Sequence, residues 1–326
     1  MKHTSKVTIL LVSFFLLTQF LALFLVSGEV QPNITLEENQ TIVSINSTLI
    51  TEVPANIFDW KAIIYLAVGI SLGTGLILLL RKLSFGGKLW KVWYFLAVYV
   101  AINFALKLLF SLTRISLAAI TLISSILALT LAFLKVRKYN FYIHNITEML
   151  MYSGIGTFIV ILFNNNILFV SILLFLIAMY DMIAVWKSGH MIKLAKFTTD
   201  NKLFPGFTMN YDSKKGNTKI ITNDTKITKT SETKNIKKRT RQAILGGGDV
   251  VFPIIFSGVV LGWLFNKGFT RMQSFGLSLI TTVFAALALY LLFYYSKKDK
   301  FYPAMPFIAS GCYLGLGILY LVLLFI

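Results

Sequence analysis

Charged residues are scarce in this chain, and acidic residues are the scarcest. Only 13% of the 326 residues are charged and 56% are hydrophobic, whereas a soluble domain carries about 25% charged residues. The charges also lie mainly in short stretches between apolar runs. Such runs need about 20 residues to cross the hydrocarbon core of a bilayer. Because they lack the alternation of barrel strands, we expect them to be membrane-spanning helices.

Cysteine and histidine are almost absent, which excludes two common kinds of site. Cys312 is the only cysteine, so the chain forms no internal disulfide. It lies in an apolar run, where a small buried hydrophobe is expected. The three histidines, His3, His144 and His190, lack the spacing of metal ligands. The sequence therefore predicts no metal and no cofactor.

Nine apolar runs are long enough to span a bilayer, and they predict an all-α polytopic membrane protein. The first run follows Lys2 and Lys6 like a signal peptide, but its length favours a retained helix. The runs divide the chain into a six-helix part (1–186), a basic and partly disordered loop (187–242) and a three-helix part (243–326). They cover residues 7–26, 60–80, 92–111, 115–134, 146–163, 167–186, 243–265, 273–294 and 303–326.

The net charge of +18 is distributed so that it sets the orientation of the chain in the membrane, and we expect no nucleic-acid partner. Alternate segments hold 26 of the 31 Lys and Arg residues, namely the N-terminal tail, 81–91, 135–145, 187–242 and 295–302. Positive charge stays on the cytoplasmic side and contacts anionic lipid there. The sequence thus predicts a multi-pass protein of the cell membrane with a cytoplasmic N-terminus and an external C-terminus.

The two longest loops differ in character. The external segment 27–59 is polar and carries three acceptor tripeptides for glycosylation in a host with that machinery, at Asn33, Asn39 and Asn46. In the inner loop, Phe207–Tyr211 and Thr218–Thr222 flank the turn-like stretch Asp212–Asn217. This pattern predicts a short β-hairpin between the sixth and seventh helices.

Eleven of the thirteen acidic residues lie outside the spans or near their ends, which makes the two exceptions informative. Asp181 lies inside the sixth run and Asp249 inside the seventh. A carboxylate at the bilayer centre costs about 2.5–3.5 kcal/mol on insertion scales, so such residues usually serve a function. Glu148 and His144 lie near the inner end of the fifth run, where we expect them to be solvated.

Asp181 and Asp249 are expected at the same depth. Each lies five or six residues from the inner end of its run, which corresponds to roughly 8–9 Å at 1.5 Å per residue. Two carboxyl groups that share one site cannot both ionise cheaply, so they hold one proton between them. An aspartic protease needs this arrangement, with one group as base toward water and the other as acid toward the carbonyl.

The residues around Asp249 favour a backbone that departs from a regular helix. Gly246, Gly247 and Gly248 precede it and Pro253 follows it, and both residue types weaken helices. Irregular backbone at membrane depth is tolerated where it lines a buried or watery cavity. The stretch Pro303-Ala304-Met305-Pro306 opens the ninth run on the same inner side and has the same property.

Three short motifs resemble those of the presenilin and signal peptide peptidase family of intramembrane aspartyl proteases. Tyr180-Asp181, Gly246-x-Gly248-Asp249 and Pro303-Ala304-Met305 resemble the family's YD, GxGD and PAL motifs, with methionine where the family usually has leucine. The resemblance implies a catalytic pair, Asp181 and Asp249. It also implies substrate-binding or site-shaping roles for Tyr180, Gly246, Gly248, Pro303, Ala304 and Met305.

The resemblance also implies a function. A presenilin-like protein of this kind hydrolyses peptide bonds within transmembrane segments of other membrane proteins, and the orientation derived above is similar to that of presenilins. The chain is most like archaeal presenilin homologues, so obligate partner subunits are not expected. Its partners are then transmembrane-helix substrates and the lipid bilayer. An unwound substrate can pair with a strand near the site, and the Phe207–Thr222 hairpin is our candidate.

Four other interpretations of the two aspartates remain open at this point. A proton- or cation-coupled secondary transporter also places carboxylates in helices, although no internal repeat is visible in this sequence. A prepilin-type peptidase shares a GxGD-like motif but has no counterpart of Pro303-Ala304-Met305. A non-catalytic scaffold is a third alternative, and a structural polar pair between two helices is a fourth.

Overall fold

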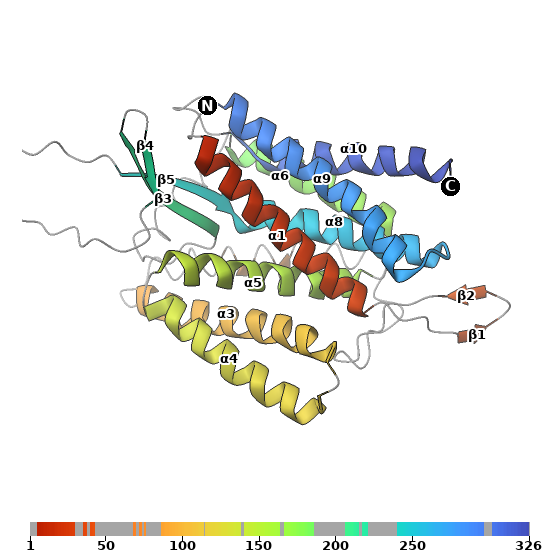
Figure 1. The fold of residues 1–326 in the computed structure, drawn as a ribbon, viewed down its shortest axis with the longest axis horizontal. Coiled ribbons are helices and arrows are strands. Elements are labelled where there is room, and N and C mark those ends of the chain that lie inside the picture. The colour runs from red at the N-terminus through yellow and green to blue at the C-terminus, as the bar shows by residue number, and fades with distance from the viewer. Residues whose placement is uncertain are drawn as a thin grey trace, which may run out of the picture.

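The computed structural model shows a helical protein with a three-stranded sheet at one end and a two-stranded sheet at the other (Figure 1). It describes residues 5–29, 35–37, 40–42, 68–69, 72–73, 75, 86–113, 115–137, 140–163, 166–185, 206–214, 217–220, 240–296 and 302–325. In these residues the order of elements is α1 (Ser5–Glu29), β1 (Thr35–Glu37), β2 (Gln40–Ile42), α3 (Gly86–Ser111), α4 (Leu117–Arg137), α5 (Phe141–Leu162), α6 (Ile167–Ile183), β3 (Gly206–Lys214), β4 (Asn217–Ile220), β5 (Thr240–Gly246), α8 (Gly247–Asn266), α9 (Arg271–Tyr295) and α10 (Met305–Leu323).

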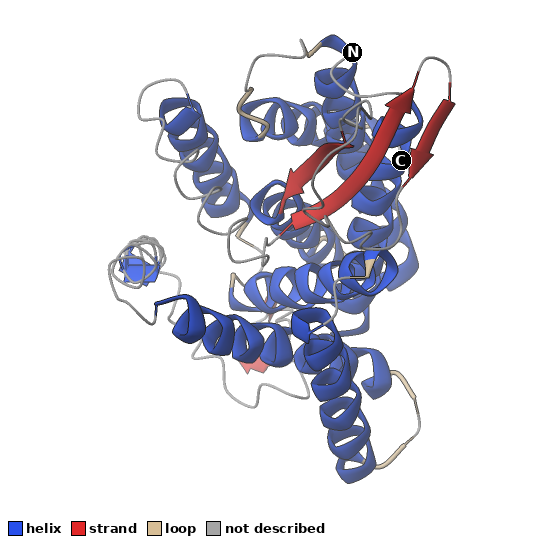
Figure 2. Cartoon of the chain, turned by 90° about the vertical axis from the view of Figure 1, so that its left-hand side faces the viewer, coloured by secondary structure: helices blue, strands red, loops and turns tan. Residues whose placement is uncertain are grey.

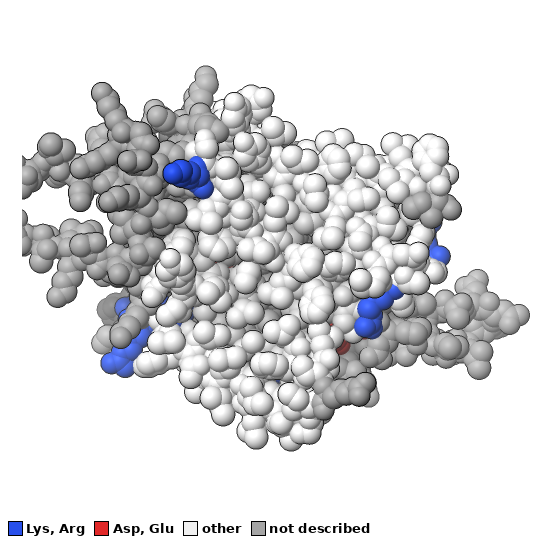
Figure 3. Space-filling view, viewed as in Figure 1, with Lys and Arg blue, Asp and Glu red and all other residues white. Residues whose placement is uncertain are grey.

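Eight of the nine predicted helices lie where the sequence placed them. Seven of the described helices are long and apolar enough to cross a membrane, and α6, with 17 residues, is apolar but shorter. The chain is therefore a multi-pass membrane protein. On the face shown in Figure 3, Lys and Arg side chains of the described residues lie near the two ends, and the broad middle is uncharged.

Several predictions fall on residues that the structure does not describe. The predicted helix at 60–80 lies almost wholly outside the described residues. The same is true of most of the external segment 27–59 and of much of the loop 187–242, whose disorder was predicted. The predicted glycosylation sites Asn33, Asn39 and Asn46 also lie outside the described residues.

Helix α1 belongs to the core of the molecule. It packs against α5, α8 and α9, and Leu11, Phe15 and Ala22 on it are fully buried. Its Gln19 donates a hydrogen bond of 2.9 Å to the carbonyl of Val250 in α8. The contacts of α1 therefore lie within the helical core.

The turn between α8 and α9 follows from local sequence signals. Gly268 has φ 93°, a left-handed conformation that glycine adopts without steric cost. Thr270 then begins α9 with a capping box, in which its side chain accepts from the N–H of Gln273 and Gln273 accepts from the N–H of Thr270. These residues turn the chain back so that α9 packs on α8.

The predicted hairpin is present and is part of a three-stranded sheet with the order β4-β3-β5 (Figure 2). Strand β3 pairs antiparallel with β4, from Tyr211↔Ile220 to Lys214↔Asn217. It also pairs antiparallel with β5, from Gly206↔Gly246 to Asp212↔Thr240. The sheet lies at the end of the molecule where α1 starts, which we call the sheet end (Figure 1).

Strand β5 corrects one predicted boundary. The seventh helix was predicted to begin at residue 243, but residues 240–246 form β5 and the helix begins at Gly247. Ala243 and Leu245 are buried while Ile244 is 37% exposed, which is the alternation of a strand. High hydropathy hid this alternation, because both strand and helix here are apolar.

Candidate active site

The two intramembrane aspartates lie at the sheet end of neighbouring helices. Asp181 is in the last turn of α6, and Asp249 is in the first turn of α8. Asp181 is buried and Asp249 is half-buried. Helices α6 and α8 pack against each other, and the two carboxyl groups are close enough to interact electrostatically. The structure thus brings together the two residues that the sequence singled out.

A backbone N–H group at the start of α10 binds the carboxylate of Asp181. The N–H of Met305 donates to Oδ2 of Asp181 at 3.2 Å, and Ala304 is the N-cap residue directly before it. The first N–H groups of a helix have no partner within the helix, and they carry partial positive charge. Pro303, which precedes them, is buried and has no N–H of its own. The strip Pro303-Ala304-Met305 therefore fixes Asp181 through its backbone.

Asp249 is held by the junction between β5 and α8. Its carboxylate lies against the backbone of Gly246, where a Cβ atom would lie only 3.2 Å from Oδ2. Glycine at 246 therefore lets the carboxylate fold back against the backbone. Gly248 is exposed, and a Cβ atom there would make only ordinary contact with the ring of Phe252, at 3.7 Å. Pro253 has no N–H to donate to the carbonyl of Asp249.

Tyr180 does not join this group. Its side chain is 66% exposed, whereas that of the neighbouring Asp181 is buried. One residue along an α-helix turns the side chain by about 100°, so the two point in different directions. In this structure Tyr180 therefore lies on a different, exposed side of α6 from the buried Asp181.

A contact between Gly247 and Tyr152 carries no signal in the sequence. A Cβ atom at residue 247 would lie 2.6 Å from the hydroxyl of Tyr152 and 2.7 Å from its ring. Tyr152 is buried on α5 and meets Phe207 of β3 edge to face, with ring centroids 5.7 Å apart. Close packing of this ring against the start of α8 therefore needs glycine at 247. Only Gly246, Gly248 and Asp249 belong to the motif that the sequence revealed.

Replacing Gly247 with alanine is expected to destabilise the start of α8 and slow cleavage. The new methyl group would overlap the ring of Tyr152, and overpacking of this kind costs about 1–3 kcal/mol. Thermal unfolding in detergent and peptide cleavage measure the two effects. Gly317→Ala is the matched control, because a Cβ atom there meets nothing within 4 Å. The explanation fails if the additional change Tyr152→Ala does not recover part of the loss.

A second buried polar cluster corrects the prediction for Glu148 and His144. Both were expected to be solvated, but Glu148 is 0% and His144 is 7% exposed. Lys135 of α4 forms an ion pair with Oε1 of Glu148 at 2.7 Å, and the hydroxyl of Tyr94 in α3 donates to the same oxygen at 3.4 Å. The two opposite charges compensate each other, which permits their burial. The prediction was wrong because Lys135 was assigned to a loop.

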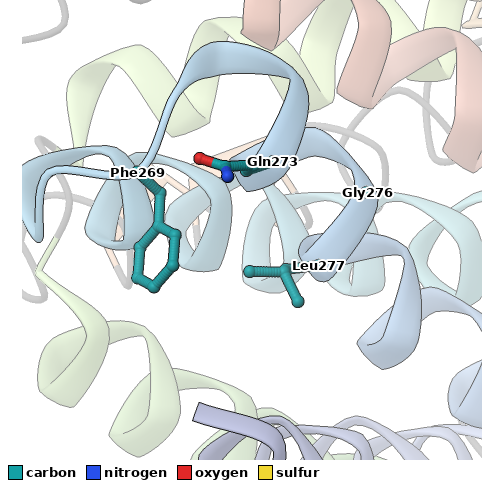
Figure 4. A pocket seen from close by; sticks show the side chains of 4 residues that line it. All are labelled: Phe269, Gln273, Gly276 and Leu277. Atoms are coloured by element: carbon teal, nitrogen blue, oxygen red, sulfur yellow. The ribbon is translucent and has the colours of Figure 1, made fainter. Parts of the chain in front are cut away.

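A surface hollow lies far from the aspartates. Phe269, Gln273, Gly276 and Leu277 line it at the turn between α8 and α9 (Figure 4). Asp249 is in the first turn of α8, whose 20 residues span about 30 Å. The hollow is therefore at the opposite end of the helix and has no part in the aspartate site.

Comparisons with known proteins agree with this architecture. Residues 12–325 match the family model described as signal-peptide peptidase, presenilin aspartyl protease. Two solved structures of a presenilin family intramembrane aspartate protease are similar in fold. The structure in the C222 space group has a TM-score of 0.60 at 16% identity and covers 97% of this chain and 99% of that one. The structure in the P2 space group has a TM-score of 0.59 at 18% identity and covers 96% of each chain. No significant match was found among curated proteins.

Proposed function

Since the chain belongs to the signal-peptide peptidase and presenilin family of aspartyl proteases, we propose that Asp181 and Asp249 are its catalytic pair. The protein is an intramembrane aspartyl protease, which hydrolyses peptide bonds within transmembrane segments. The observation that supports the assignment is the position of the two carboxyl groups, in the last turn of α6 and the first turn of α8, two helices that pack against each other. The family match gives no support to the alternative of a secondary transporter.

In the proposed mechanism the two carboxyl groups share one proton. The ionised aspartate takes a proton from a water molecule, whose oxygen attacks the carbonyl carbon of the scissile peptide. The protonated aspartate gives its proton to the carbonyl oxygen, so a neutral tetrahedral diol forms. One carboxyl group then protonates the amide nitrogen while the other removes a proton from the diol, and the C–N bond breaks. The pair ends with one proton, as it began.

The residues around the pair have positioning roles in this proposal. Met305 holds Asp181 through its N–H group, with Ala304 as the N-cap residue before it, and Gly246 leaves room for the carboxylate of Asp249. Gly248 leaves open the side from which substrate approaches, and Pro303 shapes the start of α10. Tyr180, which is exposed on α6, would contact lipid or an arriving substrate helix.

The substrate's backbone would pair with β5 of the sheet. The predicted hairpin supplies β3 and β4, but β3 has neighbours on both sides. In the described part of the chain no strand lies on the outer side of β5. Because β5 ends at Gly246, three residues before Asp249, a strand added to its outer edge would lead toward the carboxyl pair. We therefore place the added strand on β5 and not on the hairpin.

The charge pattern of the loops supports an orientation with the sheet end in the cytoplasm. In this orientation the N-terminus is cytoplasmic, the C-terminus is external, and substrates with an external N-terminus enter from the inner half of the bilayer.

We further propose that the protein acts without obligate partner subunits. The test is incubation of the purified protein in lipid with a labelled transmembrane peptide. Cleavage that a transition-state inhibitor of aspartyl proteases blocks supports the proposal, and intact peptide contradicts it.

A further inference from the structure

Helix α5 carries a buried polar face that the catalytic chemistry does not use. His144, Asn145, Glu148 and Tyr152 lie within about two turns of this helix, and each is at most 7% exposed. Polar side chains at membrane depth are costly, so each needs a partner or a task. The partners of Glu148 are Lys135, which forms an ion pair with it, and Tyr94, which donates a hydrogen bond to it. The partners of His144 and Asn145 lie in the sheet.

Asn145 holds one residue of β3 by two hydrogen bonds. Its Nδ2 donates to the carbonyl of Thr208 at 3.3 Å, and its Oδ1 accepts from the N–H of Thr208 at 3.2 Å. A paired strand would offer the same donor and acceptor to Thr208. Two residues earlier, Nε2 of His144 lies 2.9 Å from the carbonyl of Gly206. Asn145 and His144 therefore bind the same side of β3.

This side of β3 is the one that β4 does not reach. Successive residues of a strand direct their N–H and C=O groups to opposite sides. Gly206 and Thr208 use theirs toward α5, and β4 pairs only with residues 211–214. The side chains of α5 thus continue the edge of the sheet where β4 ends. Substrate cannot add to this part of β3, because its backbone groups are already bound.

Strand β5 connects the anchored part of β3 to Asp249. Gly206 pairs with Gly246, and Thr208 pairs with Ile244, so the two anchored residues lie opposite the last part of β5. The carboxylate of Asp249 in turn lies against Gly246, where a Cβ atom would be 3.2 Å from Oδ2. His144 is itself 3.8 Å from Oε1 of Glu148, which ties the anchor to the buried Lys135 ion pair.

We propose that Asn145 and His144 are positioning residues that anchor β3 to α5 and thereby fix β5 and Asp249 relative to the substrate strand. The inference rests on the proposed function, because it assumes that Asp249 is catalytic and that substrate pairs with β5. A loosened anchor lets β5 shift along or away from α5. The substrate strand could then pair with β5 in more than one register. Different peptide bonds would reach the carboxyl pair, and cleavage would spread to neighbouring positions.

The test compares Asn145→Leu with Thr147→Val in the full-length protein in lipid. Thr147 is a matched control, because it is fully buried on the same helix and its Oγ1 donates only to the helix carbonyls of Ile143 and His144. Two readouts are needed, namely amide hydrogen exchange of residues 206–209 without substrate and the positions of cleavage in a transmembrane peptide, by mass spectrometry. Asn145→Ser, which disturbs the volume less, is used if Asn145→Leu does not fold.

For Asn145→Leu we expect exchange of residues 206–209 to be about tenfold faster or more. We also expect kcat to fall roughly tenfold to hundredfold and additional cleavage positions to appear. Thr147→Val should change neither. Wild-type exchange and cleavage positions in Asn145→Leu, or equal changes in Thr147→Val, would overturn the inference. Failure of the proposed function would look different, because the wild-type protein would then leave the peptide intact while the exchange readout would still report the anchor.

Discussion

Asp249→Asn is expected to abolish cleavage of a transmembrane peptide while the protein stays folded. Asparagine has nearly the same shape but can neither take a proton from water nor hold the shared proton of the pair. General acid–base catalysis alone contributes about 10²–10⁴-fold, and loss of one member of a unit usually disables the whole unit. The measurement is single-turnover cleavage in lipid, with thermal unfolding as the test of folding.

Asp181→Asn should show the same loss, and the double variant should be no worse than either single variant. Glu29→Gln is the matched control. It makes the same chemical change at a buried carboxylate. Glu29 is the last residue of α1 and so lies at the end of that helix away from the sheet end, so cleavage should persist. Turnover retained by either purified aspartate variant would refute the assigned pair.

Lys135→Met is expected to lower the stability of the protein strongly. The side chains of Lys135 and Glu148 are 1% and 0% exposed and 2.7 Å apart, so the change leaves the carboxylate buried without its cation. Removing one partner of a buried ion pair costs about 3–5 kcal/mol. The free energy of unfolding, measured in detergent with a denaturant, gives the effect.

The double variant Lys135→Met/Glu148→Gln should recover most of this loss, because no uncompensated charge remains and the amide oxygen can still accept from Tyr94. Arg137→Met on the same helix is the control. Arg137 is exposed and lies over the ring of Phe133 at 5.3 Å, a contact worth about 0.5–1 kcal/mol. If Lys135→Met is as stable as Arg137→Met, the pair does not support the fold as described.

Local sequence patterns were sufficient for the helices and for the hairpin. Long apolar runs predicted eight described helices, because membrane crossing requires about 20 apolar residues whatever their partners are. The alternation around the turn-like stretch 212–217 predicted β3 and β4. The third strand, β5, was missed because it is apolar and runs directly into α8. Its strand character depends on pairing with β3, a contact between distant parts of the sequence.

The site residues that could be predicted from the sequence are those of a type that is rare at their position. Asp181 and Asp249 are conspicuous because charged residues are rare inside the spans, and Pro303 is conspicuous because it opens a helix. Tyr152 and Gln19 were not identified, because their importance comes from Gly247 and from the carbonyl of Val250, more than ninety residues away in the sequence. Glu148 and His144 offered a signal, since polar residues close to a span often have a function, but their solvated interpretation was wrong.

Cross-linking of cysteines placed at 181 and 249 tests the central claim most directly. Cys312 is the only natural cysteine, so Cys312→Ala gives a background without thiols. With Asp181→Cys and Asp249→Cys, a short water-soluble thiol cross-linker should join α6 to α8 in lipid. Tyr180→Cys with Asp249→Cys is the control and should stay uncoupled, because Tyr180 is 66% exposed on another side of α6. Efficient coupling of 181 to 249 alone is the result we predict, and equal coupling of the two pairs, or none of 181 to 249, would contradict a shared, water-accessible site.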